Sequence, residues 1–323
     1  MKRQIDIGAG RALDIHEISG ASAGPVLAVL GGVHGDELEG VTATRLLLRH
    51  LQDTGPSRLR GTVRIVPMSN PPAFAARQRV SPVDGANLAR VFPGRPEGTV
   101  TERIAAVITE QVIAGADMLI DLHSAGAAYE MPVFAGYVVD TATQQRARTA
   151  CMTFGAPIMW EHVGSNPGRS TSAAAALGVP SIYVEGSGGG GLVGSDLDHY
   201  INGLLRIMHW LEMTDGGPAP AAAPALLTGG DGNTDASLPC SVAGFCVTRV
   251  RSGAQVATGS LLADILDDQG RVAEQIRSPQ QGTVMMLRRS AEVKPGDGIA
   301  MLGPLPVSKG ATEGRNPANR EPN

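Results

Sequence analysis

The sequence predicts an α/β fold, in which a mostly parallel, mixed sheet carries helices on both faces and is followed by a small all-β, barrel-like domain. Short apolar stretches alternate with helical patterns over the first two thirds of the 323 residues. This alternation is typical of parallel strands that are buried on both faces. The last third instead shows strand and turn patterns, and the length fits about two domains.

The elements follow one another in a regular order. A buried strand is expected at 26–31, and a helix follows from Asp36 because apolar residues recur there at helical spacing. The helix at 101–113 begins with Thr101 and Glu102, which favour a helix start. The remaining expected strands are 62–68, 118–122, 132–139 and 181–185, and the remaining expected helices are 141–154, 170–177 and 195–213.

A domain boundary is expected at Thr214, where a Pro-, Ala- and Gly-rich stretch without period begins. Beyond it, 250–266 and 287–303 each show a strand, a glycine turn and a second strand, which predicts two related hairpin units. The expected organisation is a hydrolase domain at 1–213, a linker at 214–235, a β-rich domain at 236–304 and a disordered tail at 305–323.

Composition excludes several classes of protein. The 27 basic and 31 acidic residues give a net charge of −4 without a long basic run, so nucleic acid is not an expected partner. The sequence has neither the apolar core of a signal peptide nor 18 consecutive apolar residues, which predicts a cytoplasmic protein without a membrane partner. Three cysteines without CxxC spacing predict neither disulfides nor a thiolate zinc site.

Three potential metal ligands follow expected strands. His34 and Glu37 lie directly after the first strand, and His123 ends the buried strand in DMLIDLHSAG. Ligands of parallel sheets bind at the carboxyl edge of the strands, so the three side chains can converge there. Two histidines and a glutamate suit Zn²⁺ and leave one position open, as catalytic zinc requires. Asp121 is placed to orient the imidazole of His123.

Each motif alone has a simpler explanation, because an HxxE pair or a DxH triplet also arises by chance as a helix cap or a surface feature. Both motifs lie at strand ends and are framed by glycines that allow close backbone approach, and this combination favours a metal site.

Glu185 ends the strand 181–185 and brings a carboxylate to the same edge of the sheet. A zinc hydrolase needs a base that takes the proton from metal-bound water and returns it to the leaving amine, and Glu185 fits this role. The alternative is an ordinary carboxylate that caps the next loop. The glycine run at 186–191 lacks the Lys of a phosphate loop, so a substrate-side loop is expected.

Arginines gather in the loop ARQRVSPVDGANLARVFPGR, which contains Arg77, Arg79 and Arg90. Guanidinium groups bind carboxylates in a bidentate manner and stabilise developing oxyanions, so one or two of these arginines are expected to face the site. The alternative is that they are solvated or pair with a carboxylate such as Asp84.

Together, GGVHGDE, NPPAF, SPVDGANLARVFPG, DLHS and YVEGSG resemble the succinylglutamate desuccinylase/aspartoacylase family of zinc carboxypeptidase-like amidohydrolases. The resemblance extends to about residue 213 and includes a β-rich C-terminal appendage. It implies hydrolysis of an N-acyl amino acid with one Zn²⁺ per chain. The matching residues are His34, Glu37 and His123 as zinc ligands, Glu185 as the catalytic glutamate, Arg79 at the scissile carbonyl and Arg90 at the substrate carboxylate.

Several departures from the family pattern concern the substrate. Ala89 replaces an asparagine that normally helps Arg90 to hold a carboxylate. Aspartoacylases hold the acidic group on the acyl side of the substrate with an arginine a short distance before the catalytic glutamate. Ala175 lies near that position in this sequence, and Arg169 lies further upstream, so aspartate-type substrates are not expected. The C-terminal repeat resembles a biotinyl/lipoyl-type barrel, but SPQQGTVMMLRR has no lysine between its methionines, which disfavours a carrier function.

The leading hypothesis is therefore a zinc-dependent deacylase that acts on the linear amide of an N-acyl amino acid or a related small N-acylated amine. Two alternatives stay open: a metallocarboxypeptidase that acts on a small peptide, and a non-catalytic, metal-stabilised binding protein. The expected partner is a small-molecule substrate, and the sequence leaves the formation of a homo-oligomer open.

Overall fold

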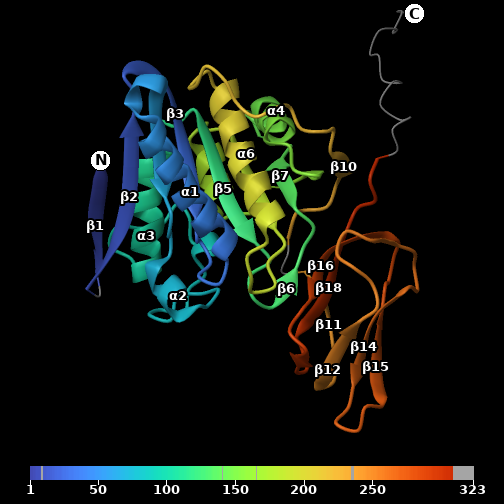
Figure 1. Ribbon diagram of the computed structural model, residues 1–323. Helices are drawn as coiled ribbons and strands as arrows, with labels where there is room; N and C mark the ends of the chain where they lie inside the picture. The colour runs from blue at the N-terminus through green and yellow to red at the C-terminus, as the bar shows by residue number, and fades with distance from the viewer. Residues whose placement is uncertain (9, 140, 165, 234–235, 308–323) are drawn as a thin grey trace, which may run out of the picture.

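A computed structural model describes residues 1–8, 10–139, 141–164, 166–233 and 236–307. The chain forms a large α/β body and a smaller all-β body beside it (Figure 1). In this view the all-β body, formed by the C-terminal third of the chain, lies below and to the right of the large sheet. No helix among the described residues is long and apolar enough to cross a membrane.

The α/β body is built on a nine-stranded mixed sheet, which confirms the predicted fold class. Five of its neighbouring strand pairs are parallel, and the pairs β1–β2, β2–β4 and β9–β7 are antiparallel. In spatial order the strands are β1 (Lys2–Gly8), β2 (Arg11–Ser19), β4 (Arg60–Val66), β3 (Ser22–Gly31), β5 (Met118–Ser124), β9 (Ser181–Gly186), β7 (Phe134–Val138), β8 (Ile158–His162) and β10 (Ala225–Thr228).

Helices cover both faces of this sheet. On one face α1 (Leu38–Thr54), α4 (Gln144–Phe154) and α6 (Gly194–Trp210) pack side by side, as Figure 1 shows. Their apolar residues form one buried cluster with the sheet. On the other face α3 (Val100–Ile108) and α5 (Ser170–Ala176) help to form a second cluster. The two cores fix the strands from both sides, so the strand ends can hold a precise site.

Four strands of this sheet were not predicted. β1 and β2 bury only alternate residues, such as Leu13 and Ile15, and β8 is short, so none of them has the continuous apolar run of a central strand. β10 lies within the expected linker 214–235 and pairs in parallel with β8. Only four residues pair there, and the Pro- and Ala-rich flanks hide them in the sequence.

The C-terminal body consists of two small antiparallel sheets around their own core. One contains β11 (Leu238–Pro239), β18 (Gly298–Gly303), β16 (Gly282–Arg288) and β13 (Gln255–Val256). The other contains β15 (Val272–Arg277), β14 (Leu261–Leu266), β12 (Gly244–Thr248) and β17 (Glu292–Val293). Residues 234–235 of the expected linker and 308–323 of the expected tail lie outside the described residues.

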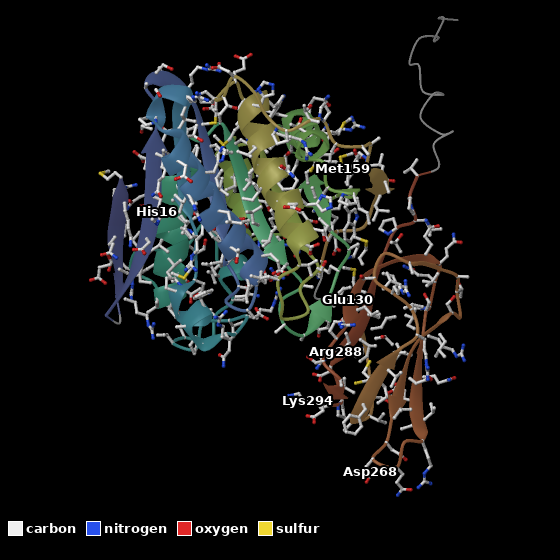
Figure 2. The ribbon with its side chains drawn as sticks, viewed as in Figure 1. His16, Glu130, Met159, Asp268, Arg288 and Lys294 are labelled. Carbon is white, nitrogen blue, oxygen red and sulfur yellow. The ribbon has the colours of Figure 1, made fainter. Side chains whose placement is uncertain are left out.

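One short strand of the α/β body joins the two bodies. β6 (Tyr129–Glu130) pairs with β16, so that Arg288 lies opposite Tyr129. Glu130 and Arg288 mark this junction in Figure 2. The C-terminal body is therefore attached next to the segment that follows β5.

Candidate functional site

The candidate residues lie at the carboxyl ends of three neighbouring parallel strands. β3, β5 and β9 are adjacent in the sheet, and His123 on β5 is in register with Glu185 on β9. His34 and Glu37 lie in the turn between β3 and α1. The structure thus brings all four sequence-predicted side chains to one edge of the sheet.

The turn after β3 depends on close backbone packing. A Cβ atom at Gly35 would lie 2.0 Å from the carbonyl carbon of Ala73, which no side chain can accept. The segment before α1 is therefore pressed against α2 (Pro71–Ala76). This packing holds His34 and Glu37, which are 3% and 2% exposed, below the surface of the site.

His34, Glu37 and His123 form a compact buried group. Nδ1 of His34 lies 2.7 Å from one carboxylate oxygen of Glu37, and Nδ1 of His123 lies 2.9 Å from the other. The potential ligand atoms of all three residues lie within 4.8 Å of one another. The group therefore meets the geometric requirement for a site that can hold one metal ion.

The second nitrogen of each histidine ring is held by an acceptor. Nε2 of His34 lies 3.0 Å from Oδ1 of Asn87, and Nε2 of His123 lies 3.1 Å from Oδ2 of Asp121. Asp121 in turn accepts a hydrogen bond from the hydroxyl of Ser170. With a proton on each Nε2, the Nδ1 atoms that face the Glu37 carboxylate are available as ligands, and either a proton or a metal ion can lie between each Nδ1 and the carboxylate.

The three residues of this group have shifted pKa values. Burial alone would raise the pKa of Glu37, but the two histidines outweigh this effect and the pKa is lowered. Burial alone would lower the pKa of His123, but the carboxylates of Asp121 and Glu37 raise it well above its usual value. Burial lowers the pKa of His34, which favours the neutral imidazole that a metal ion needs as a ligand. Glu37 stays ionised, and the two carboxylates favour positive charge beside His123.

Glu185 is a buried carboxylate beside this group. It is 8% exposed, and its Oε2 atom has no hydrogen-bond partner among the described residues. Burial raises the pKa of Glu185 to about 8. A carboxyl group that gains and loses its proton near neutral pH can act as a general base and then as a general acid.

Of the three arginines considered in the loop after α2, two line the cavity. Nη1 of Arg79 lies 3.2 Å from Glu37, and Arg90 also lines the cavity. Arg77 instead stacks on the ring of Phe74, with its guanidinium carbon 4.9 Å from the ring centroid. Asp84 accepts hydrogen bonds from the backbone and hydroxyl of Thr101, which anchors the loop to the start of α3.

These residues line a cavity of about 410 Å³, a volume within the usual range for small-molecule sites. Asp36, Tyr129, Met131, Arg169, Tyr183 and Met286 also line it, and none of them was predicted to do so. Of the two positions noted for the acyl side, Arg169 lines this cavity, whereas Ala175 lines a separate small pocket behind it. Ala89 is part of the cavity wall.

Asn87 and Met286 illustrate what sequence reasoning missed. Asn87 lies in SPVDGANLAR, a segment in which an asparagine is expected as an ordinary turn residue. Only the folded loop shows that its side chain contacts His34. Met286 comes from the C-terminal body, far along the chain. The glycine run at 186–191 is not among the lining residues, because the backbone of Gly188 binds the buried carboxylate of Glu39.

Comparison with known proteins agrees with this geometry. Residues 23–211 match the model of the succinylglutamate desuccinylase/aspartoacylase catalytic domain. The chain is 33% identical over 297 residues to an N-alpha-acetyl-L-2,4-diaminobutyric acid deacetylase of Halomonas elongata, with 89% of this chain and 84% of the relative covered.

Solved structures show the same similarity over nearly the whole chain. A succinylglutamate desuccinylase of Silicibacter sp. TM1040 is 27% identical with a TM-score of 0.84, covering 94% of this chain and 92% of that one. The product-bound ectoine utilization protein EutE (DoeB) of Ruegeria pomeroyi is 29% identical with a TM-score of 0.83, covering 94% and 93%. The chain belongs to the succinylglutamate desuccinylase/aspartoacylase family.

Proposed function

We propose that this enzyme is a zinc-dependent deacylase that hydrolyses the amide bond of an N-acyl amino acid. The observation that carries the proposal is the convergence of His34, Glu37 and His123 on one point, with the buried carboxylate of Glu185 in the same cavity. One Zn²⁺ per chain fits these residues, because two imidazoles and a carboxylate are a donor set typical of catalytic zinc and their outer nitrogens are already held.

A zinc ion in this site would supply Lewis acidity, which acidifies water and polarises the acyl carbonyl. Glu185 takes a proton from the attacking water as the new C–O bond forms. It then gives this proton to the amine nitrogen as the C–N bond breaks. The products are a carboxylate and a free amine, and Glu185 returns to its starting form. The raised pKa of Glu185, about 8, suits both steps near neutral pH.

Arg79 and Arg90 have different roles in this proposal. Arg79 lies next to Glu37, where its guanidinium can stabilise the oxyanion that develops on the acyl oxygen. Arg90 is further along the same loop and lines the cavity, where it can bind a carboxylate that is present throughout the reaction.

The size of the cavity favours a small substrate over a peptide. The C-terminal body contributes Met286 to the wall, and β6 contributes Tyr129, so the space of about 410 Å³ is enclosed from that side. A metallocarboxypeptidase needs an open groove for the peptide chain. The Halomonas elongata relative is named as a deacetylase of an N-acetyl amino acid, which supports an acetyl group as the first acyl group to test.

The experiment is a screen of N-acetyl, N-succinyl and N-formyl amino acids for released amine, with the zinc-loaded wild type and Glu185→Gln. We expect the wild type to release amine from a subset of these compounds, and Glu185→Gln, which keeps the shape of the side chain, to lose most of this turnover. Equal turnover by both proteins would exclude Glu185 as the base. No release from any compound, with zinc bound, would reject the deacylase.

A further inference from the structure

Asp36 is an acidic residue of the cavity that the proposed chemistry does not use. It lies between His34 and Glu37, is partly buried and lines the cavity. Its Oδ2 atom accepts one long hydrogen bond of 3.4 Å from the backbone of Ala127. Its Oδ1 atom is buried and has no hydrogen-bond partner among the described residues. A buried carboxylate oxygen without a donor is unfavourable, so this group calls for an explanation.

Oδ1 of Asp121 and Oε2 of Glu185 are also buried without a hydrogen-bond partner among the described residues, so the comparison with Asp36 depends on ion pairs and on roles in the chemistry. Glu37 faces two histidines and Arg79, and Asp121 contacts His123 and Ser170. Within the described part of the chain, Asp36 forms no ion pair. Glu185 also has no ion pair among the described residues, but it is the base of the proposed reaction, whereas Asp36 has neither an ion pair nor a part in that reaction.

Asp36 and two of the cavity's arginines come from different parts of the fold. Asp36 lies against the segment after β5, where a Cβ atom at Gly126 would come within 2.6 Å of its Oδ2 atom. Arg90 and Arg169 line the cavity from other elements, the loop before α3 and the start of α5, which a bridge between Phe92 and Gly168 joins. Asp36 and these two arginines therefore enter the cavity from different elements of the fold.

A ligand that complements this arrangement carries a carboxylate and an ammonium group. A carboxylate on the ligand can bind an arginine of the cavity but does not provide a counter-charge for Asp36. An ammonium group in the cavity supplies the missing positive charge, and charge-assisted hydrogen bonds to a carboxylate are among the stronger polar contacts. The ammonium group is compact and has three N–H donors, so it also suits binding to a single carboxylate.

We propose that Asp36 binds a cationic amine on the amino acid part of the substrate, so that the substrate class is an N-acyl diamino acid with one free amine. This inference rests on the proposed deacylase function and adds the residue that selects the substrate. Asp36 thereby discriminates by charge between substrates that otherwise have the same shape.

The test compares two substrates of nearly equal shape, Nα-acetyl-L-2,4-diaminobutyrate and Nα-acetyl-L-norvaline, in which a methyl group replaces the ammonium group. We expect the wild type to prefer the cationic substrate by at least about 10-fold in kcat/KM. Asp36→Asn keeps the oxygen that accepts the bond from Ala127 but removes the charge. It should lower kcat/KM for the cationic substrate by about 10- to 100-fold, mainly through KM, and leave norvaline turnover within about threefold.

A matched control is Asp268→Asn, which makes the same change of charge at an exposed turn of the C-terminal body, far from the α/β sheet (Figure 2). Asp268→Asn should leave kcat/KM unchanged for both substrates. Calorimetry provides a measurement that does not depend on turnover. L-2,4-diaminobutyrate should bind the wild type more tightly than L-norvaline does, and Asp36→Asn should remove this difference.

The outcomes separate the two proposals. If the wild type hydrolyses both substrates without preference, or if Asp36→Asn weakens both equally, Asp36 only holds the segment at Ala127 and the inference is wrong, while the deacylase stands. If the wild type hydrolyses neither of them nor any other N-acyl amino acid, both proposals fall.

Discussion

The hydrogen bond between Asp121 and His123 leads to a quantitative prediction about zinc affinity. Asp121 is 3% exposed, lies 3.1 Å from Nε2 of His123 and is fixed by Ser170. Its negative charge draws the Nε2 proton and makes Nδ1 a stronger donor to a cation. Asp121→Asn keeps the shape and an acceptor oxygen but removes the charge, so it should weaken the site without reshaping it.

The expected loss is about 10- to 100-fold in zinc affinity, the range found when the partner of a metal-binding histidine is replaced, or about 1.4–2.8 kcal/mol. The structure favours the upper half of this range, because the pair is buried and the low local dielectric strengthens the charge effect. Competition with a chromophoric chelator measures the affinity, and kcat at saturating zinc shows whether the loaded site still works.

The matched variant is Asn87→Asp on the other histidine. Asn87 Oδ1 accepts from both His34 Nε2, at 3.0 Å, and the backbone of Ala89, at 2.9 Å, and a carboxylate can accept both bonds. Asn87→Asp should therefore strengthen zinc binding, opposite in sign to Asp121→Asn. The reasoning is refuted if Asp121→Asn retains zinc affinity within about twofold, or if both variants weaken binding alike.

Three further predictions concern the arginines, the metal and the sheet. Arg79→Ala should lower kcat by about 10²–10³-fold, as expected for a residue that stabilises the oxyanion. Arg90→Ala should instead raise KM by about 10- to 100-fold. If steady-state kinetics show that Arg90→Ala leaves KM unchanged, Arg90 is a structural residue. Removal of the metal with a chelator should abolish activity. Zn²⁺ at 100 times its Kd should raise the free energy of unfolding by about 2.7 kcal/mol relative to the metal-free protein. An equal Tm with and without Zn²⁺ would argue against the metal site. Gly40→Ala places a Cβ atom 2.5 Å from the carbonyl oxygen of Leu122 and should lower the free energy of unfolding, measured with denaturant, by about 1–3 kcal/mol. Gly194→Ala is the control, because its Cβ atom would have no neighbour within 4 Å and should leave the free energy of unfolding unchanged. Equal effects of the two variants would refute this account of how α1 packs on the sheet.

The central strands and the position of the site could be predicted from the sequence because both depend on local patterns. β3, β5 and β9 are continuous apolar runs, and a polar residue at the end of such a run must lie at the edge of the sheet. His34, Glu37, His123 and Glu185 all follow this rule. The order of the strands is set by tertiary packing, so the register of His123 with Glu185 required the structure.

The partners that tune the site could not be predicted, because they come from loops whose paths have no periodic signal. Asn87 reaches His34 from a loop that follows α2, and Ser170 reaches Asp121 across 49 positions of the chain. Asp36 was visible in GGVHGDE, but its lack of a counter-charge depends on the segment at Ala127. Sequence patterns show which residues can do chemistry, and the fold decides which of their charges stay uncompensated.

The C-terminal body contributes to the wall of the cavity, which neither the sequence pattern nor the α/β body alone reveals. Leu287 and Glu130 pair across the junction, although 157 positions separate them, and this pairing brings Met286 into the cavity beside Tyr129 and Met131. Apolar thioether side chains adapt their shape but offer neither charge nor strong hydrogen bonds. An acyl group packed against this wall gains nothing from a carboxylate of its own, whereas the methyl group of an acetyl substituent loses no polar contacts there. If the proposed function is correct, this wall is the expected contact of a small neutral acyl group, and the substrate carboxylate is expected at Arg90, which enters the cavity from a different element.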